Sequence, residues 1–157
     1  MKKDTLVISA CLAGSCCRYD GSSAPLSCLN ELAEVFELIA LCPEQLGGLP
    51  SPRPCAELVA GRVLTKDGSD LTEAFLKGAR TSLSLARAQG CRAALLMERS
   101  PSCGSTCVYD GTFSGTLVEG EGIFASLLRE QGFSLYTPKT IDALMKASTA
   151  LCGSGPR

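Results

Sequence analysis

The sequence contains no histidine, and this absence excludes several common kinds of active site. Without an imidazole there is no Ser-His-Asp triad, no Cys-His nucleophile pair and no histidine ligand for zinc or haem. The side chain that most often moves protons near neutral pH is missing as well. Any catalysis must therefore rely on Cys, Asp, Glu, Lys, Ser or Tyr side chains, or on a metal.

The chain also lacks a basic excess and long apolar runs. Lys and Arg number 15 against 16 Asp and Glu, a net charge of −1, whereas nucleic-acid-binding proteins usually carry a basic excess. No apolar run approaches the ~20 residues that span a bilayer, and residues 5–10 are too short for the apolar part of a signal peptide. The composition predicts a cytoplasmic protein and disfavours a nucleic acid or a membrane as partner, and it leaves open whether the protein is a monomer or a dimer.

Cysteine, by contrast, is frequent, with ten residues in a chain of 157. This share, about 6%, is below the roughly 8–10% that marks a small disulfide scaffold. Because disulfides are rare in the cytosol, unexplained cysteines there are more often metal ligands or catalytic groups. The cysteines are therefore the first place to look for a functional site.

Short apolar runs alternate with helical patterns along the chain. The expected strands are residues 5–10, 37–41, 91–97 and 133–136, and the expected helices are residues 29–36, 71–89, 122–131 and 141–147. One or two short strands are expected within 57–65, while 43–56 and 98–120 are expected to be irregular because Pro, Gly, Ser and Thr dominate them. The alternation predicts an α/β fold, a single Rossmann-like domain whose mainly parallel sheet is flanked by helices. We expect this domain to cover residues 1–148, followed by a flexible tail at 149–157.

Three cysteines follow three of the predicted strands. Cys11 and Cys42 come directly after the first and second strands, and Cys103 lies a few residues beyond the third. The carboxyl ends of parallel strands lie at one edge of a sheet, where ligand sites form, so we expect these cysteines to converge. Three thiolates without histidine indicate a soft metal. An iron–sulfur cluster usually takes four cysteines, while for zinc the one close pair, Cys103 and Cys107, is a weak signal.

The other cysteines have less informative positions. Cys28, Cys91 and Cys152 are interpreted as small hydrophobic residues, the common role of a free cysteine. The remaining ones lie in the same loops as the three strand-end cysteines, and their roles stay open between auxiliary ligands and structural thiols: Cys16, Cys17, Cys55 and Cys107.

Five short motifs surround these cysteines, and they run in the order SACL…CRYDG, CPE…GGLPSPRP, G-x-D-x-T, ERSPSCG and YDGTFSG…GEG. In order and spacing they resemble the TudS-type 2-thiouracil desulfidase family, from about Leu6 to Tyr136. The resemblance implies a 4Fe–4S cluster held by Cys11, Cys42 and Cys103, with one iron not ligated by the protein. It also implies a non-redox hydrolysis in which this iron accepts the sulfur of 2-thiouracil, leaving uracil and sulfide.

The same resemblance assigns assisting roles to Glu44 and Ser100. The residue chemistry agrees, because attack of water on a thiocarbonyl carbon needs a general base, and without histidine a carboxylate whose pKa is raised by burial is the natural one. Glu44 lies two residues after Cys42. Ser100 lies three residues before Cys103, so its hydroxyl can hydrogen-bond the substrate. Taken alone, each is more commonly a turn or surface residue.

Arginine and tyrosine side chains in the same loops have two open interpretations. Arg18, Arg53 and Arg99 either recognise the substrate or pair with carboxylates such as those of Asp20, Glu57 and Glu98. Tyr19 and Tyr109 either stack on a flat heterocycle or fill turns. Two other functions also stay open: desulfuration of thiolated nucleosides or tRNA bases, and a non-catalytic module that binds a metal or sulfur.

Overall fold

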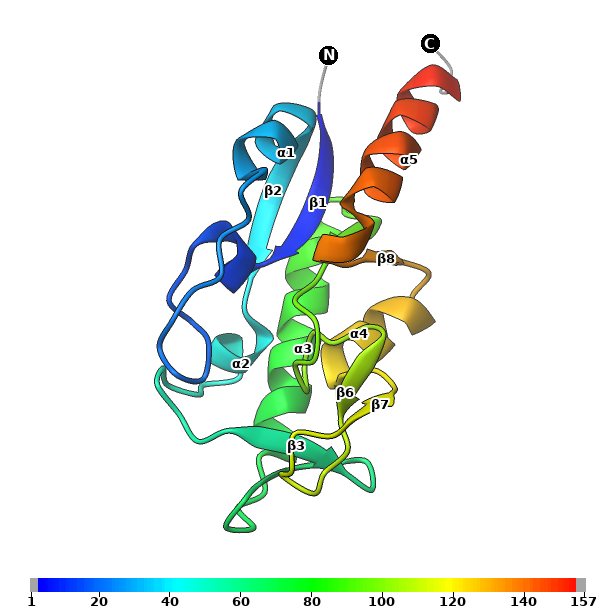
Figure 1. Ribbon diagram of the computed structural model, residues 1–157. Helices are drawn as coiled ribbons and strands as arrows, with labels where there is room; N and C mark the ends of the chain where they lie inside the picture. The colour runs from blue at the N-terminus through cyan, green and yellow to red at the C-terminus, as the bar shows by residue number, and fades with distance from the viewer. Residues whose placement is uncertain (1–2, 155–157) are drawn as a thin grey trace.

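Four parallel strands form the central sheet, in the order β2-β1-β5-β8. The computed structural model describes the backbone of residues 3–154 and the side chains of residues 3–148. The strands are β1 (Asp4–Ser9), β2 (Phe36–Leu41), β5 (Ala93–Leu95) and β8 (Ser134–Tyr136). Helices lie on both faces of this sheet (Figure 1). The predicted α/β class, with a parallel sheet flanked by helices, is confirmed.

Alternating side chains on β1 explain why both faces are covered, because successive residues of a strand point to opposite sides. Leu6 and Ile8 belong to a buried cluster with residues of α1 and α5, whereas Val7 belongs to a second cluster with residues of α3 and α4. The helices are α1 (Leu29–Val35), α3 (Thr72–Ala88), α4 (Ile123–Glu130) and α5 (Ile141–Ser154). None of the helices in the described residues is long and apolar enough to cross a membrane.

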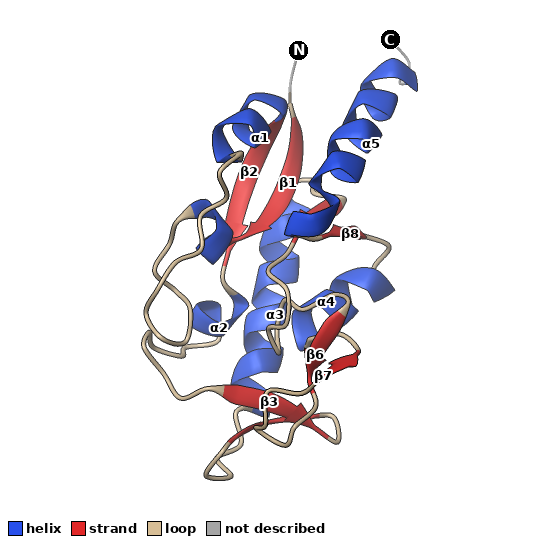
Figure 2. Cartoon of the chain, viewed as in Figure 1, coloured by secondary structure: helices blue, strands red, loops and turns tan. Residues whose placement is uncertain are grey.

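Two small antiparallel hairpins accompany the sheet, and Figure 2 shows them in red apart from it. They are β3 (Ala56–Val59) with β4 (Arg62–Thr65), and β6 (Cys107–Tyr109) with β7 (Leu117–Glu119). The first confirms the strands expected within 57–65. The second lies inside 98–120, where the expectation of irregular chain is wrong, because strands of three residues between Gly- and Ser-rich turns leave little periodic signal.

The expectation for residues 43–56 is also wrong in part, since one helical turn, α2 (Pro43–Leu46), lies there. Proline fits the first turn of a helix, where its missing N–H is not needed. At the other end of the chain, α5 continues to Ser154, beyond its expected end at 147. The backbone of 149–154 is thus helical, residues 155–157 lie outside the described residues, and the flexible tail stays a prediction.

Helix α2 approaches α3 closely because two glycines lie at their contact. A Cβ on Gly47 would stand 2.0 Å from the carbonyl oxygen of Ala74, and a Cβ on Gly78 would stand 1.7 Å from that of Pro43. Neither position leaves room for a side chain. The two glycines therefore set where α2 lies, and with it Cys42, the residue that directly precedes this helix.

We expect Gly78→Ala to lower the free energy of unfolding by about 2 kcal/mol, as overpacking of an interior does. In an open helix the same change stabilises by up to ~1 kcal/mol, because alanine is the better helix former, so the sign of the effect is diagnostic. Urea unfolding followed by circular dichroism measures it. Ser84→Ala, at an exposed position of the same helix, is the control and should stay within about 0.5 kcal/mol. A stabilised Gly78→Ala variant would contradict the close contact.

Candidate functional site

A cavity of about 920 Å³ lies at the carboxyl ends of the sheet strands, and its wall includes Cys11, Cys42 and Cys103. Cys11 lies in a 3₁₀ turn, η1 (Ala10–Ala13), that directly follows β1. Cys42 is the residue between β2 and α2, and Cys103 lies in the loop that follows β5. The structure thus brings together three cysteines that are far apart in sequence.

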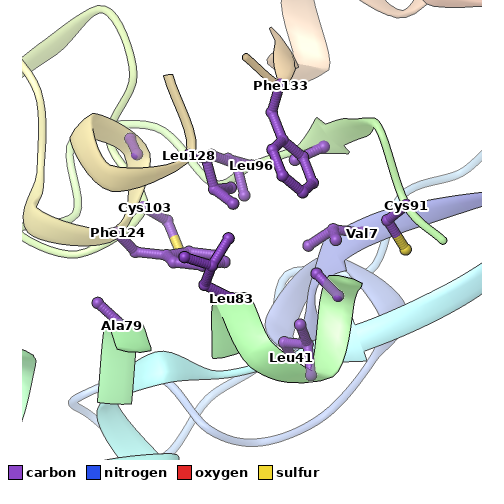
Figure 3. Close-up of a cluster of buried hydrophobic side chains, with 13 residues drawn as sticks. Val7, Leu41, Ala79, Leu83, Cys91, Leu96, Cys103, Phe124, Leu128 and Phe133 are labelled. Atoms are coloured by element: carbon purple, nitrogen blue, oxygen red, sulfur yellow. The ribbon is translucent and has the colours of Figure 1, made fainter. Parts of the chain in front are cut away.

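The environment of these thiols is buried and rich in sulfur. Burial raises the pKa of both Cys11 and Cys103; nearby Cys42 adds to the rise at Cys11, and Cys11 adds to the rise at Cys103. Cys103 also belongs to the hydrophobic core between the sheet, α3 and α4, where Figure 3 shows it among side chains that include Phe124 and Leu83. The raised pKa values favour the neutral thiols. In the deprotonated form that binds a metal, these side chains need a positively charged partner among them.

The donor set fits an iron–sulfur cluster. All three side chains offer sulfur, the usual ligand of such clusters. Within the part of the chain that the structure describes, no group of three or more Cys, Asp and Glu side chains gathers closely enough to hold one ion. Cys107, which the zinc alternative would pair with Cys103, lies in β6 and is not among the residues that line the cavity.

Two of the four cysteines with open roles also line the cavity, namely Cys17 and Cys55. Cys17 is 3% exposed, and burial together with the neighbouring Cys42 raises its pKa to about 12. Cys16 is exposed instead. Among the described residues, the cavity wall therefore includes five thiols, of which Cys11, Cys42 and Cys103 lie in the segments that follow β1, β2 and β5.

Two of the three cysteines interpreted as structural, Cys28 and Cys91, are not among the residues that line the cavity. Cys91 is buried in the core between the sheet, α3 and α4, and Cys28 packs against the core on the other face. The side chain of Cys152 lies outside the described residues. No disulfide joins the nine cysteines whose side chains the structure describes.

Glu44 lies in the first turn of α2, and both oxygens of its carboxylate are engaged. Oε1 accepts a hydrogen bond from Nε of Arg53 at 2.9 Å and lies 2.8 Å from Nη2 of the same guanidinium. Oε2 accepts hydrogen bonds from the hydroxyls of Ser102 at 2.8 Å and Ser100 at 3.3 Å. The side chain is 14% exposed and lines the cavity, so it is oriented by the protein yet reachable from the cavity.

Arg53 joins three segments around the cavity, and its side chain is only 4% exposed. Besides Glu44, its guanidinium donates to the carbonyl oxygens of Pro50 and Cys17, each at 2.9 Å, and to the hydroxyl of Ser51 at 2.7 Å. Of its two open interpretations, pairing with a carboxylate is confirmed. The partner is Glu44 rather than Asp20, Glu57 or Glu98. The sequence does not indicate this partner, because the pairing depends on the paths of two loops.

Ser100 and Ser102 form a hydrogen-bonded turn beside Cys103. The hydroxyl of Ser100 accepts the backbone N–H groups of Ser102 and Cys103, each at 3.0 Å, and lies 2.9 Å from the hydroxyl of Ser102. Ser102 is 2% exposed and was missed by sequence reasoning. Its position next to Cys103 and two residues after Ser100 was the available signal. The turn connects the loop of Cys103 to the carboxylate of Glu44.

The other arginines and tyrosines of these loops also lie at this cavity. Its wall includes Arg18, Arg99, Tyr19 and Tyr109. The structure thus places them where a ligand can touch them, and contact with a substrate stays a prediction for each.

Comparison with known proteins gives the class of this chain. Residues 6–140 match the model of the 2-thiouracil desulfurase family. Because this match covers most of the chain, the protein belongs to that family of enzymes, and the predicted family is confirmed.

Two relatives illustrate the match. A solved structure of the [4Fe-4S]-dependent thiouracil desulfidase TudS is 42% identical and aligns with a TM-score of 0.90, over 94% of this chain and 99% of that one. The uncharacterized protein YbbK of Bacillus subtilis (strain 168) is 35% identical in an alignment of 150 residues, which covers 89% of this chain and 99% of YbbK.

We expect Arg53→Ala to lower the free energy of unfolding by about 3 kcal/mol, because it removes the positively charged partner of a largely buried carboxylate and the guanidinium hydrogen bonds to the carbonyls of Cys17 and Pro50. Arg62→Ala is the matched control. It removes a pair with Asp70 in which the two side chains are 57% and 39% exposed, and such pairs contribute at most about 1 kcal/mol. Urea unfolding of both variants tests the difference, and equal losses would contradict a special role for Arg53.

Proposed function

We propose that this protein is a [4Fe–4S]-dependent desulfidase that hydrolyses 2-thiouracil to uracil and sulfide without a change of redox state. The observation that carries the proposal is the meeting of Cys11, Cys42 and Cys103 at one cavity, with Glu44 in the same wall. The name of the 42% identical relative, a [4Fe-4S]-dependent thiouracil desulfidase, supports it. The predicted cytoplasmic location and small-molecule partner belong to this proposal.

In this proposal the three cysteines hold the cluster and leave one iron without a protein ligand. When bound, the cluster supplies a Lewis acid for a thiocarbonyl sulfur. The chain supplies the rest: the cavity wall places a flat heterocycle beside the thiols, and aromatic side chains such as Tyr109 are available to its faces.

Glu44 is the general base in this proposal. Exchange of sulfur for oxygen at the ring carbon consumes one water, which loses protons as H₂S forms, and no electrons are gained or lost. Glu44 takes a proton from this water, and the contacts of its carboxylate with Arg53 and Ser102 hold it in one direction. The hydroxyl of Ser100, 3.3 Å from Oε2 of Glu44, is placed to donate to the oxygen that joins the carbon.

A thiolated nucleoside is the second candidate substrate. The cavity volume of about 920 Å³ is near the upper end of the roughly 300–1,000 Å³ common for small-molecule sites, which leaves room for more than a free base. Thiolated tRNA is disfavoured because the net charge is −1. Sulfide release from 2-thiouracil, 4-thiouridine and thiolated tRNA, assayed side by side, separates the three.

Iron and sulfide counting after anaerobic purification tests the ligand set. We expect about four iron atoms per chain in the wild type and a loss of most of them in Cys11→Ala, Cys42→Ala and Cys103→Ala, because each removes a ligand. Cys91→Ala, in the core away from the cavity, is the control that should keep its iron. One zinc per chain and no sulfide released from 2-thiouracil would contradict the proposal and favour a non-catalytic module.

Activity of variants that keep the cluster tests the proton chemistry. We expect Glu44→Gln to lower kcat about 100-fold or more, because general bases contribute at least that much, and Ser100→Ala to lower it about 10-fold to 100-fold. Iron content should not change. Glu98→Gln is the control, since Glu98 lines the same cavity but pairs with Lys139 at its edge. A Glu44→Gln variant with wild-type kcat would remove Glu44 from the mechanism.

A further inference from the structure

The cavity contains a second buried carboxylate, that of Glu57 in β3. Glu57 as a whole residue is only 6% exposed. Its Oε1 accepts the backbone N–H groups of Gly111 at 2.9 Å and Phe113 at 3.1 Å. Its Oε2 accepts no hydrogen bond, and no Lys or Arg forms an ion pair with it, among the residues that the structure describes.

This free oxygen is not sealed inside the protein. In the described part of the chain, the hydroxyl of Ser82 is the one side-chain polar atom that is both closed off from solvent and without a partner. Oε2 of Glu57 is therefore not fully buried. Since Glu57 lines the cavity, we infer that this oxygen is accessible from there. A buried carboxylate oxygen without a donor is unfavourable, so the position is suited to a donor that a ligand brings.

Glu44 and Glu57, both in the wall of the cavity, differ in this respect. Both oxygens of Glu44 accept hydrogen bonds from Arg53, Ser100 or Ser102, which orient this carboxylate for its role as the base. Glu57 offers one acceptor to the cavity. A ring N–H of a heterocycle is the matching group, because a carboxylate accepts such a donor in a short, charge-assisted hydrogen bond.

The turn that donates its backbone N–H groups to Glu57 packs closely against β3. Gly111 has φ of +91°, and a Cβ on it would stand 2.7 Å from the carbonyl oxygen of Leu58, so the turn lies against β3 with no room for a side chain. Tyr109 and Phe113, on either side of this glycine, both line the cavity. The cavity wall thus includes Glu57 and two residues with flat side chains, a set suited to a planar ring that carries an N–H group.

We propose that Glu57 is a substrate-binding residue whose Oε2 accepts a hydrogen bond from a ring N–H of the thiolated pyrimidine. The inference rests on the proposed function and names a recognition contact within it. Glu57 exchanges no proton with the substrate. Substrates are then heterocycles with a free N–H at the position that faces Glu57, and alkylation of that nitrogen prevents this contact.

Glu57→Gln tests the contact with little change in shape. The amide oxygen can still accept the N–H groups of Gly111 and Phe113, while the amide NH₂ replaces the cavity-facing acceptor with a donor. The probe is uracil, the product, which has the same ring N–H groups and is not turned over. Calorimetric titration of the anaerobic holoenzyme should show uracil binding at least tenfold weaker in Glu57→Gln, with unchanged iron content and melting temperature. Glu98→Gln should bind as the wild type does.

Methylated probes identify the nitrogen and separate recognition from structure. We expect one of 1-methyluracil and 3-methyluracil to bind the wild type at least tenfold more weakly than uracil, and to lose nothing further in Glu57→Gln, because the contact is already absent. If Glu57→Gln disturbs the fold, the wild-type comparison of the two methyl compounds with uracil decides alone.

The inference is overturned if Glu57→Gln binds uracil as the wild type does, if both methyl compounds bind as uracil does, or if the wild type binds no uracil. Failure of the proposed function has another signature. In that case the wild type releases no sulfide from 2-thiouracil, while its binding of uracil still depends on Glu57.

Discussion

The ion pair between Arg53 and Glu44 is the interaction on which the arrangement of the cavity depends. A guanidinium that is 4% exposed is stable only when its donors are paired, and here they reach Glu44, the loop of Cys17 and the segment of Pro50 and Ser51. One side chain thereby fixes the loops on either side of Cys42. Arginine suits this place because its planar fork serves several acceptors at once, which a lysine ammonium cannot do in the same geometry.

Backbone contacts of glycine provide the second constraint. Gly78 lets the carbonyl of Pro43 approach α3, and Gly111 lets the second hairpin lie against β3. In both cases a side chain would displace a wall of the cavity. The walls that carry Glu44 and Glu57 are therefore positioned by the absence of a side chain at Gly78 and Gly111. The polar contacts then orient the two carboxylates.

The sequence was sufficient for the parts of the fold that have strong periodic or apolar patterns. The apolar runs around Val7 and Ile39 predict parallel strands, and their order predicts that Cys11 and Cys42 meet at one edge. The partners of Arg53, the contact of Ser102 with Glu44 and the open oxygen of Glu57 depend on how loops pass one another in space. No pattern along one segment encodes such contacts, and the short strands of the second hairpin are hidden for a similar reason.

Cys103 has its side chain in the hydrophobic core as well as in the wall of the cavity. A group that binds this sulfur only in the folded protein adds its binding free energy to the stability of the packing that surrounds it. Binding of a group at the sulfur of Cys103 and the packing of α3 against α4 are then thermodynamically linked. The amide hydrogen exchange of Leu128, a buried residue of α4 in the same core, becomes a reporter of whether the site is filled.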